Sequence, residues 1–232
     1  MLSDNAVMLL LRSAVLAGGI GLSEKETKKK LLESAKKEFL EKGYMHASLR
    51  NICKNAGVTT GALYFFFRDK KALFAALVDE PLQKLHDIMN LHYQEEITET
   101  EMVMEQLTQQ DISGDLETAK QIVHYLYQYY DEFQLVLVKG QGSGYESCVD
   151  QFVDITEKHY RRLADRVTEQ LGIEKMGGYI LHWMAHMQTD AFVYMLAHEK
   201  SEEEAMKSIE DIVQYMVSGW LGPVSYTHLT LP

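Results

Sequence analysis

The sequence predicts an all-α protein. Three observations lead to this prediction: the chain of 232 residues has only three prolines, apolar residues recur at helical spacing along most of it, and alternating runs of β-branched residues are few. A content of 46% hydrophobic and 25% charged residues is that of an ordinary globular protein, which argues against a disordered or collagen-like chain. The length suits one large or two small domains.

Charge is distributed unevenly along the chain. The formal net charge is −11, which by itself would discourage binding to nucleic acid. Residues 24–74 carry twelve Lys/Arg against six Asp/Glu, a net charge of +6, whereas residues 75–232 carry ten against 27. This asymmetry predicts that the basic N-terminal part meets a polyanion and the acidic remainder does not.

The N-terminal part reads as a series of short helices with capping residues between them. The first helix is expected from about Ser23 to Lys42, and Gly43 ends it with a left-handed residue. Serine, threonine and aspartate are frequent N-caps. The elements that follow are a short helix capped by Ser48, a turn at Ala56-Gly57-Val58, a helix at Gly61–Phe67 capped by Thr59 or Thr60, and a longer helix from Lys70 capped by Asp69.

Three helices whose last two are joined by an Ala-Gly-Val turn have the arrangement of a helix-turn-helix. A glycine turn lets two helices cross steeply, so that the second presents its outer face to a DNA major groove. Since this motif coincides with the +6 segment, double-stranded DNA is the expected partner.

Several motifs in this segment together resemble the N-terminal domain of the TetR/AcrR family of bacterial transcriptional regulators. They are Gly43-Tyr44, Ser48 to Ile52, Ala56 to Phe67 and Asp69 to Phe74. The resemblance covers about residues 24–74, and it implies that the first three helices bind operator DNA while a variable helical domain dimerises and binds an effector. Two residues depart from the pattern: Phe66 stands where the family often has His or Tyr, and Cys53 replaces a more usual Ala.

The predicted DNA-binding residues lie on and around the second short helix. Thr59, Thr60 and Phe65 are expected to read base edges, although Thr59 can equally serve only as a helix cap, and Gly61 allows close approach. Tyr64 and Ser48 are expected to hold phosphates, and the resemblance implies the same for Tyr64 and for Lys70. Arg50 is a weaker candidate, because a solvated basic face would look the same.

The remainder of the chain continues with helical periods and shows no catalytic constellation, so no enzyme activity, cofactor or metal is predicted. The segment Lys139–Gly144 has three glycines but lacks the ending of a phosphate loop and a preceding strand, which favours a loop between helices. His182 and His186 share a helical face as metal ligands would, yet no glutamate or third ligand accompanies them, and structural histidines are favoured.

The last two helices, 178–198 and 201–221, are predicted to form a homodimer. The first is apolar on more than one face, which a single core would not require, and the residues assigned to the interface are Trp183, Met187, Phe192 and Tyr215. The alternative is a central helix of a monomeric bundle. Tyrosines and methionines of the body can line an effector pocket or simply fill the core; the polar candidates are His124, Tyr125, Glu146 and His182.

The predicted organisation has four parts. Residues 1–22 form an extra N-terminal segment, which fits a signal peptide poorly; the alternatives are an extra N-terminal helix and a start site placed too far upstream. Residues 23–70 form the helix-turn-helix domain and 71–223 the effector-binding and dimerisation domain; 224–232 resemble a non-native tail. Two separated cysteines indicate a reduced, cytoplasmic protein, and no membrane partner is expected.

The predicted function is that of a one-component transcriptional repressor. A homodimer would bind palindromic operator DNA and be released when a small-molecule effector changes the separation of its two DNA-binding parts. The alternatives are a helical small-molecule-binding protein or enzyme without DNA binding, and a module for an acidic protein partner.

Overall fold

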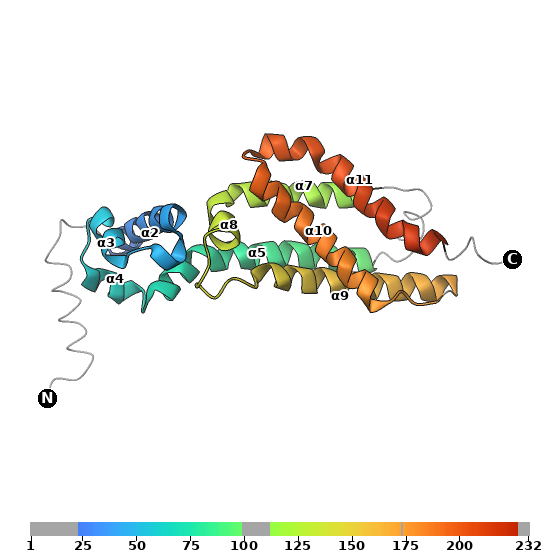
Figure 1. The fold of residues 1–232 in the computed structure, drawn as a ribbon, viewed down its shortest axis with the longest axis horizontal. Coiled ribbons are helices and arrows are strands. Elements are labelled where there is room, and N and C mark those ends of the chain that lie inside the picture. Colours follow the sequence, from blue (N-terminus) through green and yellow to red (C-terminus); the bar gives the residue numbers. More distant parts are fainter. Residues whose placement is uncertain (1–22, 99–111, 173, 227–232) are drawn as a thin grey trace, which may run out of the picture. The chain divides into compact units, whose positions relative to one another are not determined.

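A computed structural model describes residues 23–98, 112–172 and 174–226 (Figure 1). These residues form helices and no strand, so the prediction of an all-α fold is confirmed. The helices are α2 (Glu24–His46), α3 (Leu49–Ala56), α4 (Thr60–Phe66), α5 (Lys70–Thr98), α7 (Ser113–Gln128), α8 (Tyr130–Leu137), α9 (Cys148–Leu171), α10 (Gly178–His198) and α11 (Glu202–Tyr226).

The chain divides into two compact units. The head comprises residues up to Glu80 together with Gln134–Glu146, and the body comprises Pro81–Phe133 and the residues from Ser147 onward. The head therefore includes the beginning of α5 and a later segment. The predicted boundary at residue 70 placed both of these in the second domain. Helices α5 and α8 each contribute residues to both units.

Local side-chain caps set the helix boundaries of the head. Ser48 Oγ accepts from the amide of Asn51, and Thr59 Oγ1 accepts from that of Ala62. Both bonds satisfy amides that the first turn of a helix leaves without a partner. Asp69 caps α5 in the same way, through a 2.8 Å bond from the Ala72 amide. Gly57 ends α3 in the left-handed conformation with φ of 69°, which glycine adopts without a Cβ clash.

The head is built around an aromatic and aliphatic core. Phe39 of α2 and Phe74 of α5 are completely buried and meet edge to face with their ring centroids 5.2 Å apart. Ile52 of α3 and Leu63 of α4 are equally buried. One core thus fixes α4 against the two helices that support it, and burial of each such side chain contributes about 1.5–3 kcal/mol.

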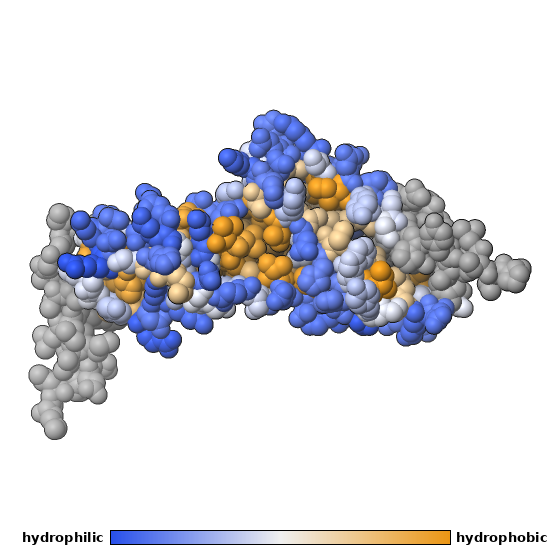
Figure 2. Space-filling view, in the orientation of Figure 1, coloured by the Kyte–Doolittle hydropathy of each residue, from blue (hydrophilic) through white to orange (hydrophobic). Residues whose placement is uncertain are grey.

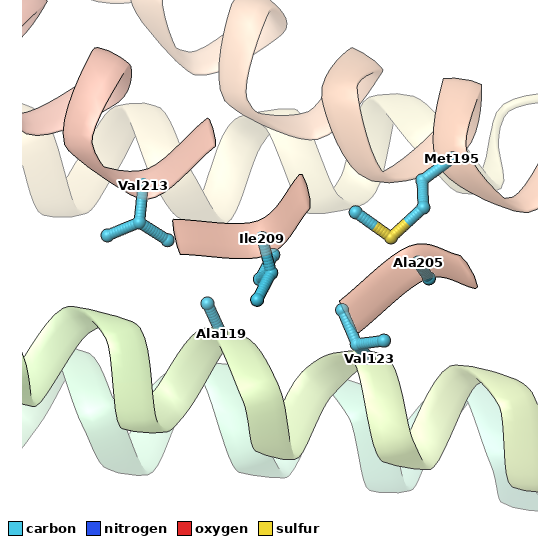
Figure 3. Close-up of a cluster of buried hydrophobic side chains, with 6 residues drawn as sticks. All are labelled: Ala119, Val123, Met195, Ala205, Ile209 and Val213. Carbon is cyan, nitrogen blue, oxygen red and sulfur yellow. The ribbon is translucent and has the colours of Figure 1, made fainter. Parts of the chain in front are cut away.

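The body has its own apolar core between α7, α10 and α11. Figure 3 shows α11 lying over α7, with its side chains pointing toward those of α7 and Met195 of α10 completing the cluster. The six residues are Ala119, Val123, Met195, Ala205, Ile209 and Val213. Small alanines on facing helices allow this close packing.

The long helix predicted from Lys70 is confirmed as α5, which continues to Thr98 although Pro81 lies inside it, and the division between head and body along α5 falls at this proline. The predicted end of the last helix at residue 221 was wrong, because α11 continues through Pro223 to Tyr226. Proline fits the helical φ and removes one backbone donor, so packing can carry a helix past it. The predicted N-terminal segment 1–22 and residues 227–232 lie outside the described residues.

Within the described residues, no helix is long and apolar enough to cross a membrane.

Candidate nucleic-acid interface

Helix α4 has one buried and one exposed face. Ala62 and Leu63 are buried against the head, whereas Thr60, Gly61 and Tyr64 are exposed on the opposite side together with Phe65, whose ring meets that of Phe66 edge to face. Tyr64 keeps 57% of its surface accessible. A short helix with hydroxyls, a glycine and aromatic rings on its free face can present them to base edges and phosphates.

Gly61 leaves the exposed face of α4 open, although neither the backbone conformation nor the packing of the head requires a glycine at this position. A Cβ atom added to Gly61 would meet only Thr59 Oγ1, at an ordinary 3.7 Å. The head itself therefore tolerates a side chain here, and the benefit of glycine is on the solvent side, where it allows another molecule to come close.

The hydroxyls of Thr59 and Ser48 cap helices of the head. Thr59 is exposed, but its hydroxyl oxygen caps α4. Ser48 caps α3, and its own amide donates to Glu38 Oε1 over 3.1 Å. The α3 N-terminus, which the sequence suggested as a phosphate site, thus already holds a carboxylate of the same unit. Arg50 and Lys54 are exposed on α3.

Glu38 is a residue that the sequence analysis missed. It is only 6% exposed and lies on the buried stripe of α2 beside Phe39. Besides the Ser48 amide, its Oε1 lies 3.5 Å from Asn51 Nδ2. Its spacing from Leu31 and Ala35 places an acid on an apolar face, and this was the available signal. Glu38 joins α2 to the beginning of α3 and so helps to orient the helix-turn-helix.

Replacement of Glu38 by alanine is expected to lower the free energy of unfolding by about 1.5–3 kcal/mol, because a buried hydrogen bond to an ionised group is lost. Urea unfolding of the full chain measures this change. Glu33→Ala is the matched control, since Glu33 lies on the same helix with a solvent-exposed side chain. An equal loss in both variants would contradict the assigned role of Glu38.

Lys70, at the start of α5, is held close to the end of α2. Its ammonium donates to the carbonyl of Met45 over 3.2 Å and lies 4.8 Å from the centroid of the Tyr44 ring. Burial lowers the pKa of Lys70, and the nearby Glu38 carboxylate opposes this shift. The cation is thus fixed in position rather than freely solvated.

The three N-terminal helices, with a capped and solvent-exposed α4, have the arrangement of a helix-turn-helix, the class of unit that places its second helix in a DNA major groove. Residues 31–77 match the family model described as bacterial regulatory proteins, tetR family. The resemblance of this N-terminal segment to the TetR/AcrR family is therefore confirmed.

Known relatives support the same assignment. The chain is 39% identical over 62 residues to the HTH-type transcriptional regulator TtgR of Pseudomonas putida, and 38% identical over 64 residues to the HTH-type transcriptional repressor BepR of Brucella suis. These matches cover 27% and 28% of this chain, but only 29% and 31% of the relatives. The crystal structure of NalD from Pseudomonas aeruginosa is similar in fold, with a TM-score of 0.53 at 20% identity, over 85% of this chain and 98% of that one.

The four candidate effector residues are engaged with different partners. Glu146 belongs to the head, whereas the other three belong to the body. His124 Nδ1 lies 2.9 Å from Glu202 Oε1, and the Tyr125 hydroxyl donates to the carbonyl of Pro81. His182 Nδ1 lies 2.7 Å from Glu157 Oε2, and hydrogen bonds from His182 and Arg161 lower the pKa of Glu157.

A different set of polar residues meets inside the body. The hydroxyls of Tyr93 on α5 and Thr156 on α9 lie 3.1 Å apart, and Gln188 on α10 donates to Tyr93 over 3.4 Å. Gln188 also accepts a hydrogen bond from the hydroxyl of Tyr160. His159 stacks on Tyr93 with ring centroids 4.0 Å apart, and Tyr93, Thr156 and His159 are buried. Three helices thus share a polar network that sequence reasoning could not find, because its members are far apart in the chain.

Helix α10 exposes a row of large side chains on its outer face. Tyr179, Trp183, Met187 and Tyr194 lie four, four and seven residues apart, which is one side of a helix, and all four are exposed. Tyr215 on α11 is exposed as well. Phe192 instead packs against the core cluster of the body itself. Figure 2 shows apolar residues gathered among hydrophilic ones on the face of the body that α10 and α11 cross.

The two histidines of α10 lie together. The rings of His182 and His186 meet edge to face with centroids 4.7 Å apart. In the described part of the chain, no group of three or more His, Cys, Asp or Glu is arranged to hold a metal ion.

Proposed function

We propose that this protein is a TetR-like one-component transcriptional regulator, a repressor that binds palindromic operator DNA as a homodimer and releases it on binding a small-molecule effector. The observation that carries the proposal is the exposed face of α4, with Thr60, Gly61 and Tyr64 on a rigidly capped helix. This helix enters the major groove and reads bases, while Tyr64 and Lys70 hold phosphates.

Dimerisation follows from the geometry of helix-turn-helix units on palindromic DNA. A palindromic site presents two half-sites related by a two-fold axis, so two heads must be joined by a self-complementary surface. The row of Tyr179, Trp183, Met187 and Tyr194 on α10, with Tyr215 of α11, supports a second copy of the chain as the occupant of this face. Aromatic residues and methionine are enriched in such interfaces.

An effector site in the body is supported by the network of Tyr93, Thr156 and Gln188. Buried hydroxyls and an amide can bind a ligand that carries hydrogen-bonding groups on an apolar frame. We propose these residues in place of His124, Tyr125, Glu146 and His182 as the first contacts to test. The protein then has two conformations, one that fits the operator and one that does not. Effector binding lowers the affinity for DNA by as much as the effector binds the second conformation more tightly than the first.

Footprinting and gel-shift titration of the purified protein on the DNA upstream of its own gene test the proposal. The expected result is a protected palindrome, bound with an affinity that falls steeply with salt. A dimer that shows no salt-sensitive preference for any palindrome would refute it. Turnover of a small molecule in the absence of DNA binding would favour the enzyme alternative instead.

Lys70→Ala is expected to weaken binding to all DNA sequences alike. Loss of one phosphate contact makes the plot of log affinity against log salt concentration shallower by about one unit. Fluorescence anisotropy over a salt series measures this slope. Lys207→Ala, which removes an exposed lysine from α11, should leave it unchanged. An unaltered slope for Lys70→Ala would argue against a phosphate contact at this residue.

A further inference from the structure

The glycine-rich segment between α8 and α9 folds around an anion supplied by the protein itself. The amide of Gly142 donates to the carboxylate of Glu146. Hydrogen bonds from the amides of Glu146 itself, Gly142 and Gly144 lower the pKa of this carboxyl, and the charge of Lys71 adds to the effect. These three amides, at alternate positions of one loop, converge on one anion; we call this arrangement the nest, since it resembles the backbone concavities that bind phosphate or carboxylate groups.

The two glycines of this nest need their backbone conformation. Gly142 and Gly144 have φ of 83° and 90°, in the left-handed region. A Cβ on Gly142 would come within 2.3 Å of Met45 Sδ, and one on Gly144 within 2.7 Å of Lys71 Nζ. The loop is therefore shaped both to converge its amides and to lie against the end of α2 and the start of α5.

Other contacts attach the same loop to the rest of the head. The Tyr44 amide donates to the carbonyl of Lys139 over 2.8 Å, and Tyr145 packs on Phe74 while its hydroxyl donates to Asp79. Met45, against which Gly142 rests, provides the carbonyl that holds the ammonium of Lys70. A continuous set of contacts thus runs from Glu146 through Gly142 and Met45 to Lys70.

We propose that the loop Lys139–Glu146 is a clasp, closed by the Glu146 carboxylate in the nest of loop amides, and that this clasp positions Met45 and Lys70 for contact with DNA. Glu146 is then a positioning residue for DNA binding that lies far outside the helix-turn-helix in sequence. The closing of the clasp does not depend on the proposed function; its effect on DNA binding does.

The lowered pKa of Glu146 gives the clasp a pH dependence of known sign. Hydrogen bonds to the ionised carboxylate stabilise the closed loop at pH values above the ordinary range for glutamate. The contribution is lost as the pH falls through the lowered pKa of the folded protein. Acidification therefore opens the clasp, and neutral pH keeps it closed.

Amide hydrogen exchange of the full chain, followed by NMR, tests whether Glu146 closes the loop. In Glu146→Ala the amides of Gly142 and Gly144 are expected to exchange roughly tenfold faster than in the wild type. Sodium acetate should slow them again, compared with sodium chloride at equal ionic strength, because acetate supplies the missing carboxylate. Glu80→Ala, an exposed glutamate of the head, is the matched control. Unchanged exchange rates in Glu146→Ala, or no difference between the two salts, would overturn the clasp.

A double-mutant cycle tests whether the clasp acts through Lys70. The probe is a random-sequence DNA duplex at low salt, to which binding depends on phosphate contacts. Glu146→Ala and Glu146→Gln are expected to weaken binding several-fold, with little further loss when Lys70→Ala is added, since residues in one network are not additive. Additive losses, or unchanged affinity in both Glu146 variants, would overturn the positioning role. Absence of DNA binding by the wild type would refute the proposed function and leave the exchange result standing.

Discussion

Gly61→Glu is expected to abolish DNA binding without harming the fold. The glycine lies on the exposed face of α4, and a Cβ there meets only Thr59 Oγ1 at 3.7 Å. Glutamate also favours a helix over glycine. In a complex with DNA, however, the new carboxylate would face phosphates and separate the helix from the groove. Like charges in contact cost several kcal/mol, so affinity should fall roughly 100-fold or more.

The same substitution in the body provides the control for this result. Gly114 lies in the first turn of α7, and a Cβ added there has no atom of the protein within 4 Å. Gly114→Glu should retain wild-type affinity in the same anisotropy titration, and both variants should keep the wild-type melting temperature. Wild-type affinity in Gly61→Glu would show that α4 does not enter the groove.

Trp183→Glu is expected to dissociate the proposed dimer. Trp183 is 47% exposed in the single chain and belongs to the row of large exposed side chains on α10. A carboxylate buried there against a second copy would lack a partner, and the dissociation constant of the dimer should rise roughly 100-fold or more. Sedimentation velocity over a concentration series measures the change, and affinity for a palindromic site should fall with it.

Leu91→Glu is the matched control for the dimer, because Leu91 is also a large, exposed apolar residue of the body but lies on α5. It should sediment as the wild type does. If Leu91→Glu and Trp183→Glu dissociated equally, the row on α10 would not be the contact surface. A wild-type chain that sediments as a monomer at all concentrations would refute dimerisation itself.

The helices of the head could be predicted because their boundaries are set by neighbouring residues. Ser48, Thr59 and Asp69 each cap a helix by accepting from the amide three residues further on, and Gly57 turns the chain between α3 and α4. Such local interactions are visible as short patterns in the sequence. The helical character of the body and the exposed row on α10 follow from periodicity in the same way.

The contacts that orient these helices could not be predicted, because they join residues far apart in the chain. Glu38 reaches the beginning of α3, and the carbonyl of Lys139 accepts from Tyr44. The partners of the effector candidates were hidden for the same reason: His124 and His182 look alike as polar residues on apolar helices, yet each pairs with its own carboxylate. Periodicity identifies which face of a helix is apolar but not which helix it meets.

The head is discontinuous in sequence, since Gln134–Glu146 belongs to it although the whole first part of the body lies in between. On a ribosome, Tyr44 and Phe74 therefore emerge well before the segment that covers them, and the head is completed only after α8 has been made. For protein engineering, a chimaera that transfers the helix-turn-helix to another effector domain must transfer two pieces of chain. A graft of the N-terminal residues alone would leave Tyr44 and Phe74 beside a loop of foreign sequence.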